Sequence, residues 1–547
     1  MTIRTADNDD CIKSQDDTHN FEDLQITSLR NQDREQAWEV SLPATVRKDL
    51  GKQKVMLVNS PNETDNQLEN ANYSLFPHIG IVQLATRLKA HFREDVDVQV
   101  VDGGITEITR IHERIKNYQP NMLGISVLTP TYGEGLKLAK TGKELQSSVV
   151  LGNDHAMFFP REILRNQSSV DYVIVNDVAE TPLVELMEAS MGRRRLDDVC
   201  SLAYRKNDGI IINPLKKYDL DKTNTVPDLS LIEADLPRYS EKYFETHGHL
   251  HGKKVNLVTI NNARGCENTL RCSYCSIADL RINTGDPKAF WATVDSYHEK
   301  YGINLFFEVY DSFTASPKYS TALLETMPDR MRQKIDDGQI EFMIYARALG
   351  LLKRDNVTRF RQLGVKRINI GLDSGDSKIL EAQRKNKTSD ETNLQALKLL
   401  GDAGISVHGS FMLGAAGETV ATVQKTVNHI FDIVKMVQFS SIEVSRLYPL
   451  PNSPIWDMLV DYYRPKFYKD SQEIDSVLKF LNVHIAPEVH QALSTKYSGR
   501  DLFDRAELMS DWYEHFTHIE ESFALDQIER VNQFIKANRI QTGNNIG

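Results

Sequence analysis

The stretch Val255-Asn-Leu-Val-Thr-Ile-Asn-Asn-Ala-Arg-Gly-Cys-Glu-Asn-Thr-Leu-Arg-Cys-Ser-Tyr-Cys275 joins a candidate buried strand directly to a group of three cysteines. These are Cys266, Cys272 and Cys275, which fall within ten residues. The whole chain of 547 residues has five cysteines, so random placement accounts poorly for three of them in one short window. The stretch therefore predicts a metal site at the end of a strand.

The number of cysteines in this window bears on the kind of metal site. Soft thiolates on one loop suit an iron–sulfur cluster or zinc, and Gly265 lets the backbone turn closely around the metal. Three protein ligands without a fourth nearby cysteine leave one metal position open, which a reactive site needs and a closed structural site avoids. A zinc site would need a fourth ligand such as His249 or His251. The spacing alone leaves both metals open.

Length and charge limit the classes of protein to which the chain can belong. A chain of 547 residues exceeds the usual size of a single core, so we expect two or three domains. The net charge of -11 argues against nucleic-acid binding, which needs a concentrated basic face, and favours a small-molecule substrate. No apolar run approaches the roughly 20 residues that span a bilayer, and the N-terminus lacks a signal-peptide pattern. We therefore expect a cytoplasmic protein without membrane contact, whose thiols stay reduced.

The first 194 residues divide into two parts. Residues 1–50 are polar and rich in Asp, which predicts a disordered tail. Residues 51–194 contain five candidate buried strands separated by helix-spaced apolar residues, which predicts a doubly wound, Rossmann-like parallel sheet. The candidate strands are residues 55–59, 96–102, 122–127, 149–152 and 170–175. Such sheets bind ligands at the carboxyl ends of their strands, where polar turns fall at residues 59–63, 126–131, 152–155 and 176–180.

The remaining residues predict a second strand–helix series. Residues 195–250 are interpreted as a connector with a candidate hairpin at residues 202–213. Residues 251–464 predict a partial (β/α)6 barrel, with the cysteine loop at the face where barrel chemistry collects. Its candidate strands are residues 255–261, 305–310, 340–346, 365–372, 405–413 and 439–447. Residues 465–547 are predicted to form a C-terminal helical cap over the substrate.

These motifs together resemble the radical S-adenosylmethionine (radical SAM) enzymes. A glycine-preceded cysteine trio follows the first strand of a strand–helix series, and the aromatic Tyr274 precedes the last cysteine. Ile370-Gly-Leu-Asp-Ser-Gly-Asp376, then Leu380 and Lys385-Asn-Lys-Thr388, looks like a second family stretch, and Leu413-Gly-Ala-Ala-Gly-Glu-Thr419 looks like a third. Residues 76–80, 150–155 and 170–181 resemble the cobalamin-binding domain that is fused to one large subgroup. The resemblance covers about residues 53–460.

The resemblance implies the cofactors and the residues that hold them. Cys266, Cys272 and Cys275 would hold three irons of a [4Fe-4S] cluster, and S-adenosylmethionine (SAM) would chelate the fourth. One electron, supplied by an external donor such as flavodoxin or ferredoxin, would split SAM into methionine and a hydrogen-abstracting 5′-deoxyadenosyl radical. The implied SAM-binding residues are Tyr274 near the adenine, Asp311 at the amino group, Asp373 near the ribose, and Arg347 and Arg446 at the carboxylate. The implied cobalamin-binding residues are Ser126, Thr129, Gly152, Asn153, His155 and Asp177.

Three features depart from the family pattern. The first gap between cysteines is five residues, whereas most of the family has three. The Asp-x-His-x-x-Gly motif, with which some relatives donate a histidine to cobalt, does not occur after Asn59, which resembles the fused enzymes that bind cobalamin without a histidine ligand. Asn176-Asp-Val-Ala-Glu180 replaces a glycine-rich turn of the family, which limits close backbone approach to a cofactor.

Three functions stay open at this point. The first is methylation of an unactivated carbon or phosphorus centre of a small metabolite or natural-product intermediate, with methylcobalamin as the immediate donor. The second keeps the radical chemistry but cyclises or rearranges the substrate without methyl transfer. The third is a non-catalytic metal-binding module in which the cysteines have a structural role.

Overall fold

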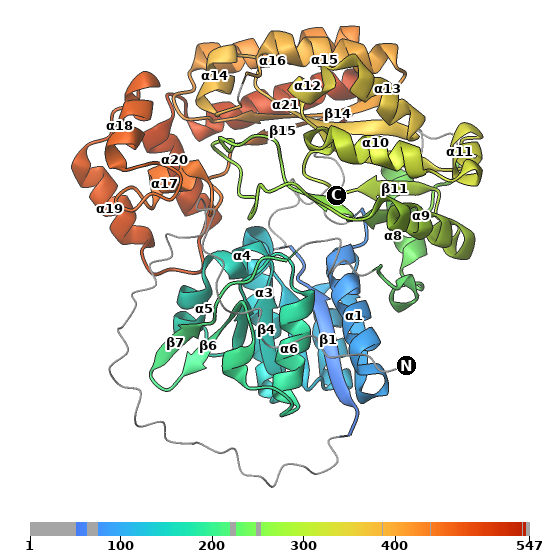
Figure 1. Ribbon diagram of the computed structural model, residues 1–547. Helices are drawn as coiled ribbons and strands as arrows, with labels where there is room; N and C mark the ends of the chain where they lie inside the picture. The colour runs from blue at the N-terminus through green and yellow to red at the C-terminus, as the bar shows by residue number, and fades with distance from the viewer. Residues whose placement is uncertain are drawn as a thin grey trace.

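The structure is a computed structural model that describes residues 51–62, 75–218, 226–247, 253–385, 387–437, 439–538 and 540–542. The predicted tail at residues 1–50 and the zinc-ligand candidates His249 and His251 lie outside these described residues. Figure 1 shows two sheet-containing halves, the N-terminal one in blue to green and the C-terminal one in green to red.

The N-terminal half contains a sheet of seven strands within the described residues, in the order β2-β1-β3-β4-β5-β6-β7. The strands are β1 Gln53–Asn59, β2 Val96–Asp102, β3 Met122–Ser126, β4 Ser148–Gly152, β5 Tyr172–Ile174, β6 Leu202–Lys206 and β7 Gly209–Ile212. The first five are parallel, which confirms the predicted Rossmann-like sheet. The β6–β7 hairpin, expected in a connector, instead extends this sheet, because β6 pairs antiparallel with β5.

Helices cover both faces of this sheet, because alternate side chains of a strand point to opposite sides. On β1, Val55 and Leu57 share a core with α1 and α6, whereas Met56 and Val58 share a core with α2, α3 and α5. The helices are α1 Ile79–Phe92, α2 Ile108–Tyr118, α3 Tyr132–Glu144, α4 Asp154–Phe158, α5 Pro160–Asn166 and α6 Glu180–Ser190. A parallel sheet that is buried on both faces leaves its loops, not its faces, available to a ligand.

The C-terminal half contains a second sheet of seven strands among the described residues, all parallel, in the order β8-β11-β12-β13-β14-β15-β16. The strands are β8 Leu257–Ile260, β11 Leu305–Glu308, β12 Glu341–Ala346, β13 Val365–Asp373, β14 Ser406–Leu413, β15 Phe439–Arg446 and β16 Gln541–Thr542. The first six confirm the predicted barrel strands. The edge strands β8 and β16 do not pair in the part of the chain described, so the barrel is partial. The sequence did not predict β16, because two residues are too short to show a period.

Helices follow the barrel strands and cover the outside of the second sheet (Figure 1). They are α9 Pro287–Tyr301, α10 Pro317–Thr326, α11 Asp329–Asp336, α12 Ala348–Leu351, α13 Arg354–Gln362, α14 Ser377–Ala382, α15 Asp390–Asp402 and α16 Val420–Met436. The C-terminal region is helical, as predicted, with α17 Pro454–Leu459, α18 Ser471–Phe480, α19 Pro487–Tyr497, α20 Arg505–Phe516 and α21 Glu521–Ala537. Helix α21 contacts β15 and α16, so this region packs against the barrel. The predicted domain boundaries stay predictions.

A continuous apolar core joins the two halves. Ile79 and Ile81 of α1 belong to the same buried cluster as Val258 and Ile260 of β8. In addition, the Thr259 hydroxyl donates a hydrogen bond of 2.8 Å to the backbone carbonyl of residue 77. The amino end of α1 is therefore fixed against the first strand of the barrel.

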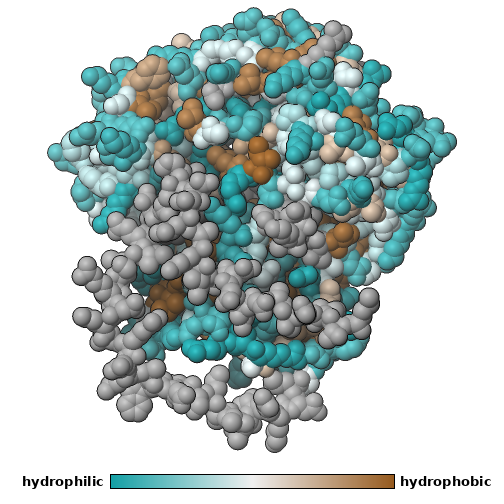
Figure 2. All heavy atoms as spheres, in the orientation of Figure 1, coloured by the Kyte–Doolittle hydropathy of each residue, from teal (hydrophilic) through white to brown (hydrophobic). Residues whose placement is uncertain are grey.

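The outer surface is largely polar on the face that Figure 2 shows, where apolar side chains form small, separate groups. The grey atoms in this view belong to residues outside the described ranges. Among the helices that the structure describes, none is both long and apolar enough to cross a bilayer.

Asp501 forms a second connection, between the C-terminal helices and the N-terminal sheet. It lies in the loop between α19 and α20 and is 3% exposed. Its carboxylate accepts hydrogen bonds from Asn166 Nδ2 at 2.7 Å, from Gln167 Nε2 at 2.9 Å and from the Tyr132 hydroxyl. Because one buried carboxylate takes three donors from the other half of the molecule, its loss leaves the buried Tyr132 hydroxyl without its acceptor and removes two further hydrogen bonds between the halves.

We expect Asp501→Ala to lower the free energy of unfolding by about 2–5 kcal/mol, because it removes a buried carboxylate that accepts hydrogen bonds from the buried Tyr132 hydroxyl and from two side-chain amides. Urea-induced unfolding of the full chain measures the change. Asp402→Ala provides the control, because Asp402 is an exposed residue at the end of α15 and its loss should change stability by less than about 0.5 kcal/mol. Equal effects of the two substitutions would contradict the role of Asp501.

Candidate functional site

The cysteine loop begins directly after β8 and is closed at its base by a short ribbon. The strands β9 Ala263–Arg264 and β10 Asn283–Thr284 pair antiparallel on either side of the loop. Gly265 adopts a φ of +100°, and a Cβ atom there would lie 2.1 Å from the backbone carbonyl oxygen of Arg281. Only glycine fits this position. The residue before the first cysteine is thus held against the chain that follows the last one.

The three thiols are free and partly buried in this loop. Burial raises the pKa of Cys266 to about 12 and that of Cys275 to about 11. A metal that binds these sulfurs must therefore displace protons, since the thiolate is the ligand form. The Cys272 sulfur accepts a hydrogen bond of 3.1 Å from Asn268 Nδ2.

The donor set of this loop fits a multi-iron cluster. Within the described ranges, no three His, Cys, Asp or Glu side chains lie close enough together to hold a single metal ion. In a four-iron cluster each thiolate binds a different iron, so the three sulfurs need not converge on one point. The zinc alternative depends on His249 or His251, of which the structure describes nothing.

Tyr274 connects the cysteine loop to the end of β13. Its hydroxyl donates a hydrogen bond of 2.8 Å to Asp373 Oδ2, and Lys385 forms an ion pair with the same carboxylate. Asp373 is 3% exposed and has a φ of 62°, an unusual value for a residue other than glycine. Burial raises the pKa of Tyr274 well above its usual value. Asp373 thus already has two partners, and its implied contact with a ribose stays a prediction.

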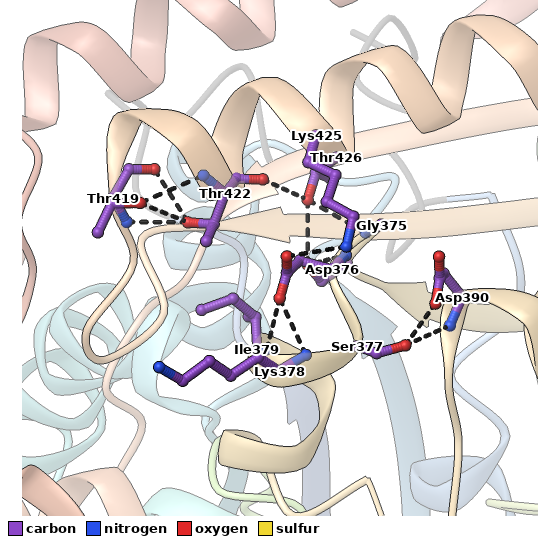
Figure 3. A network of polar contacts seen from close by, with 11 residues as sticks. Gly375, Asp376, Ser377, Lys378, Ile379, Asp390, Thr419, Thr422, Lys425 and Thr426 are labelled. Atoms are coloured by element: carbon purple, nitrogen blue, oxygen red, sulfur yellow. Dashed lines mark hydrogen bonds and ion pairs between the residues drawn. The ribbon is translucent and has the colours of Figure 1, made fainter. Parts of the chain in front are cut away.

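The segment after Asp373 is clamped to α16, as Figure 3 shows. The backbone N–H of Gly375 donates to Thr426 Oγ1 at 3.1 Å, and a Cβ atom on Gly375 would lie 2.8 Å from the Thr426 Cα atom. Asp376 caps α14 by accepting a hydrogen bond from the Lys378 N–H at 2.9 Å and forms an ion pair with Lys425 at 3.1 Å. This part of the second family stretch therefore fixes the backbone that carries Asp373.

The two arginines predicted to bind the SAM carboxylate differ in their surroundings. Arg347, which follows β12, is 9% exposed, and its Nε and Nη2 atoms are buried without a hydrogen-bond partner in the described part of the chain. Arg446, at the end of β15, forms an ion pair with Glu521 of α21. A buried guanidinium without an acceptor fits an anionic ligand. Arg347 therefore fits a carboxylate better than Arg446 does.

Two polar residues that the sequence analysis did not single out lie at the end of β11. Glu308 is 1% exposed, and burial raises its pKa to about 8, so this carboxyl group is mostly protonated at neutral pH. Its Oε2 atom and the Tyr310 hydroxyl are buried, and neither has a partner among the described residues. The sequence could have indicated Glu308, because it is a polar residue at the end of a predicted strand.

Asp311, the predicted ligand of the SAM amino group, accepts a hydrogen bond of 2.7 Å from the Gly265 N–H, and burial raises its pKa.

A cavity of about 330 Å³ lies where the two sheets meet. From the N-terminal sheet it is lined by Ser126, Gly152, Asn153, Asp154, Asn176 and Asp177, among others. From the barrel it is lined by Asn261, Arg264, Val309 and Asp311, and also by residues 277–279, which follow the last cysteine of the loop. A Cβ atom on Gly152 would meet nothing within 4 Å, so glycine leaves room for a ligand here. The cavity thus opens at the carboxyl ends of parallel strands, where such sheets bind ligands.

Ser126, Gly152, Asn153 and Asp177 of the predicted cobalamin-binding residues line this cavity, but Thr129 and His155 do not. His155 is buried; its Nδ1 lies 3.1 Å from Thr129 Oγ1, and its Nε2 lies 2.7 Å from the Asp501 carbonyl oxygen. Burial lowers the pKa of His155 to about 4. Because both ring nitrogens have partners outside the cavity lining, the cavity does not support His155 and Thr129 as cobalamin-binding residues, and these two assignments stay predictions.

Three further residues of the cavity were not predicted from the sequence as site residues. His78, at the amino end of α1, lines the cavity, and its Nδ1 atom is buried without a partner within the described segments. Arg264 Nη1 donates to the Asp177 carbonyl oxygen at 2.8 Å and so connects the barrel to the sheet. Burial, with Asp177 and Asp311 nearby, raises the pKa of Asp154 to about 7. The sequence places His78 and Arg264 inside quoted motifs but gives no sign that they face the same cavity.

Two family models match the chain in the regions that contain these sites. Residues 260–430 match the Radical SAM superfamily, and residues 73–186 match the B12 binding domain. The matched ranges lie in the C-terminal and the N-terminal half, respectively. They confirm the expectation of two cofactor-binding domains in this order.

Similar proteins extend over both halves. The chain is 22% identical over 471 residues to "Uncharacterized methyltransferase PH0819" of Pyrococcus horikoshii, covering 84% of this chain and 95% of that protein. It is 25% identical over 362 residues to the anaerobic magnesium-protoporphyrin IX monomethyl ester cyclase of Rubrivivax gelatinosus, covering 64% of this chain and 61% of the cyclase.

Solved structures show the same fold. The structure of OxsB, a cobalamin-dependent S-adenosylmethionine radical enzyme, matches with a TM-score of 0.61 and 14% identity, covering 89% of this chain and 67% of OxsB. The structure of TsrM, a radical S-adenosylmethionine methyltransferase from Kitasatospora setae, matches with a TM-score of 0.58 and 16% identity, covering 89% of this chain and 99% of TsrM. The predicted order of a sheet domain, a barrel and a helical C-terminus is thereby confirmed.

We expect Asp154→Asn to change how stability depends on pH. The raised pKa of Asp154 means that between about pH 4 and pH 7 the folded chain keeps a proton that the unfolded chain has lost, so this residue lowers stability as pH rises. An asparagine at position 154 does not titrate, so it does not contribute to this loss of stability as pH rises. Relative to the parent, the variant should gain on the order of 1–3 kcal/mol in free energy of unfolding between pH 5 and pH 8.

Urea unfolding at the two pH values checks this expectation. Asp208→Asn, at an exposed position in the β6–β7 turn, provides the control and should show no such gain. A parallel pH dependence of the parent and Asp154→Asn would contradict it.

Proposed function

Because the chain belongs to the radical SAM superfamily and carries a B12-binding domain, we propose that it uses SAM and cobalamin to methylate an unactivated carbon or phosphorus centre of a small metabolite or natural-product intermediate. The observation that carries this proposal is the shared cavity. Its walls come from the strand ends of the B12-binding sheet and from the segment that follows the cysteine loop. A substrate between these walls is within reach of both domains.

Each cofactor has candidate residues in the structure. Cys266, Cys272 and Cys275 would hold a [4Fe-4S] cluster, and Arg347 would bind the SAM carboxylate. Cobalamin would lie against Ser126, Gly152, Asn153 and Asp177. When bound, these groups supply reductive cleavage of SAM to a 5′-deoxyadenosyl radical and a methyl group carried on cobalt. An external electron donor such as flavodoxin or ferredoxin is part of the proposal.

The residues of the chain contribute position, charge and exclusion of water. Arg347 provides a buried cation whose free donors match a carboxylate. Arg264 extends from the barrel to the Asp177 backbone and so holds the segment before the cysteine loop against the N-terminal sheet domain. The protonated Glu308 keeps the interior of the barrel free of a further negative charge. Exclusion of water around the reacting groups would protect a radical from side reactions.

The relatives support two outcomes. PH0819 and TsrM carry methyltransferase names, whereas the Rubrivivax gelatinosus protein is a cyclase. Radical cyclisation or rearrangement without methyl transfer is therefore the second candidate function. We favour methylation because the methyltransferase relative is aligned over 84% of this chain, against 64% for the cyclase.

An experiment without the substrate separates the two candidates. The full chain, loaded anaerobically with iron, sulfide and cobalamin, is incubated with methyl-deuterated SAM and a reductant. Methylation predicts that the label moves to cobalamin with release of S-adenosylhomocysteine, alongside 5′-deoxyadenosine. Formation of 5′-deoxyadenosine without labelled cobalamin would favour cyclisation or rearrangement. Absence of both products from a cluster-loaded chain would contradict either form of radical SAM chemistry.

We expect Arg347→Met to weaken SAM binding by about 10- to 150-fold, the loss of about 1.5–3 kcal/mol for hydrogen bonds to a charged group. Equilibrium dialysis of the cluster-loaded chain with labelled SAM measures the affinity. Arg446→Met provides the matched control, because Arg446 is paired with Glu521, and it should change the affinity by less than about threefold. A larger effect from Arg446→Met than from Arg347→Met would reverse the two assignments.

A further inference from the structure

Asn268 lies in the five-residue segment that separates Cys266 from Cys272. It is 1% exposed, whereas its neighbour Leu270 is 59% exposed. A buried polar side chain requires hydrogen-bond partners. The contacts of Asn268 therefore show what the longer gap between the cysteines places beside the sulfurs.

The amide nitrogen of Asn268 has two acceptors. Its Nδ2 atom donates to Cys272 Sγ at 3.1 Å and to the Arg384 backbone carbonyl oxygen at 3.0 Å. A backbone carbonyl can only accept, so the nitrogen, and not the oxygen, of the amide must face Arg384. Because Nδ2 is the atom that faces Arg384, it is also the atom of the Asn268 amide that lies beside Cys272 Sγ.

Backbone contacts hold this arrangement in place. The Arg271 N–H donates to the Asn268 carbonyl oxygen at 2.9 Å, which closes a turn, and the Ser273 N–H donates to the Gln383 carbonyl oxygen at 2.9 Å. Gln383 and Arg384 follow α14, so the loop is attached to the barrel on both sides of Cys272. These contacts thus hold the amide of Asn268 toward the Cys272 sulfur.

We propose that Asn268 is a positioning residue that raises the reduction potential of the iron–sulfur cluster by hydrogen bonding to the Cys272 thiolate. The proposal rests on the proposed function, because it requires that Cys272 be a cluster ligand. One-electron reduction adds negative charge to the cluster and its sulfurs, and an N–H donor stabilises the more negative form. The two extra residues in the gap provide the length that brings this amide beside the sulfur.

The test is an EPR-monitored redox titration of the full chain without SAM, after anaerobic loading and measurement of bound iron and sulfide. Asn268→Leu keeps the size of the side chain and removes the donor, and Asn268→Ala removes the side chain. Both should make reduction less favourable by about tenfold, which is about 59 mV toward lower potential for one electron. Leu270→Ala, in the same segment, should leave the potential unchanged.

Each outcome is decisive. Cluster-loaded Asn268 variants with the parent potential would overturn the proposal while leaving the proposed function intact. Failure of both Asn268 variants to hold a cluster that Leu270→Ala holds would make Asn268 an assembly residue and would also overturn it. A parent chain that binds no cluster would contradict the proposed function itself.

Discussion

The contact between Arg264 and Asp177 is the interaction on which the arrangement of the site depends. Arg264 lies directly before the cysteine loop, and Asp177 follows β5 of the N-terminal sheet. Parallel sheets gather their ligand-binding loops at the carboxyl ends of their strands. A contact between those two ends therefore surrounds one cavity with the loops of both sheets. The apolar core at α1 and β8 and the hydrogen bonds of Asp501 hold the halves in this position.

Several buried polar groups near the proposed cofactor sites have no hydrogen-bond partner among the described residues. Buried polar atoms in folded proteins almost always have hydrogen-bond partners. In the described part of this chain, atoms of His78, Glu308, Tyr310 and Arg347 are exceptions. His78 lines the shared cavity, and the other three follow or end barrel strands near the cysteine loop. These four residues lie beside the sites proposed for the two cofactors, and further unpartnered polar atoms lie elsewhere in the described part of the chain.

Local sequence patterns predicted both sheets, because each strand is a short buried run that ends in a polar turn. The same patterns predicted that Ser126 and Gly152 would reach a ligand site, since both end strands of one sheet. They gave no sign of the surroundings of His155, whose partner Asp501 lies 346 residues further along the chain. They also could not separate Arg347 from Arg446, because Glu521, which pairs with Arg446, belongs to a distant helix. In both examples the surroundings of the side chain depend on a partner that is remote in sequence, which local patterns do not show.

The cysteine loop and the B12-binding sheet face one cavity, so a bound cluster and a bound cobalamin would be close neighbours. The most direct measurement is the EPR relaxation of the reduced cluster in the full chain, with and without bound cob(II)alamin. The two paramagnetic centres should interact, and the cluster signal should relax faster when cob(II)alamin is present. An identical relaxation rate in the two samples, at full occupancy of both cofactors, would contradict this arrangement.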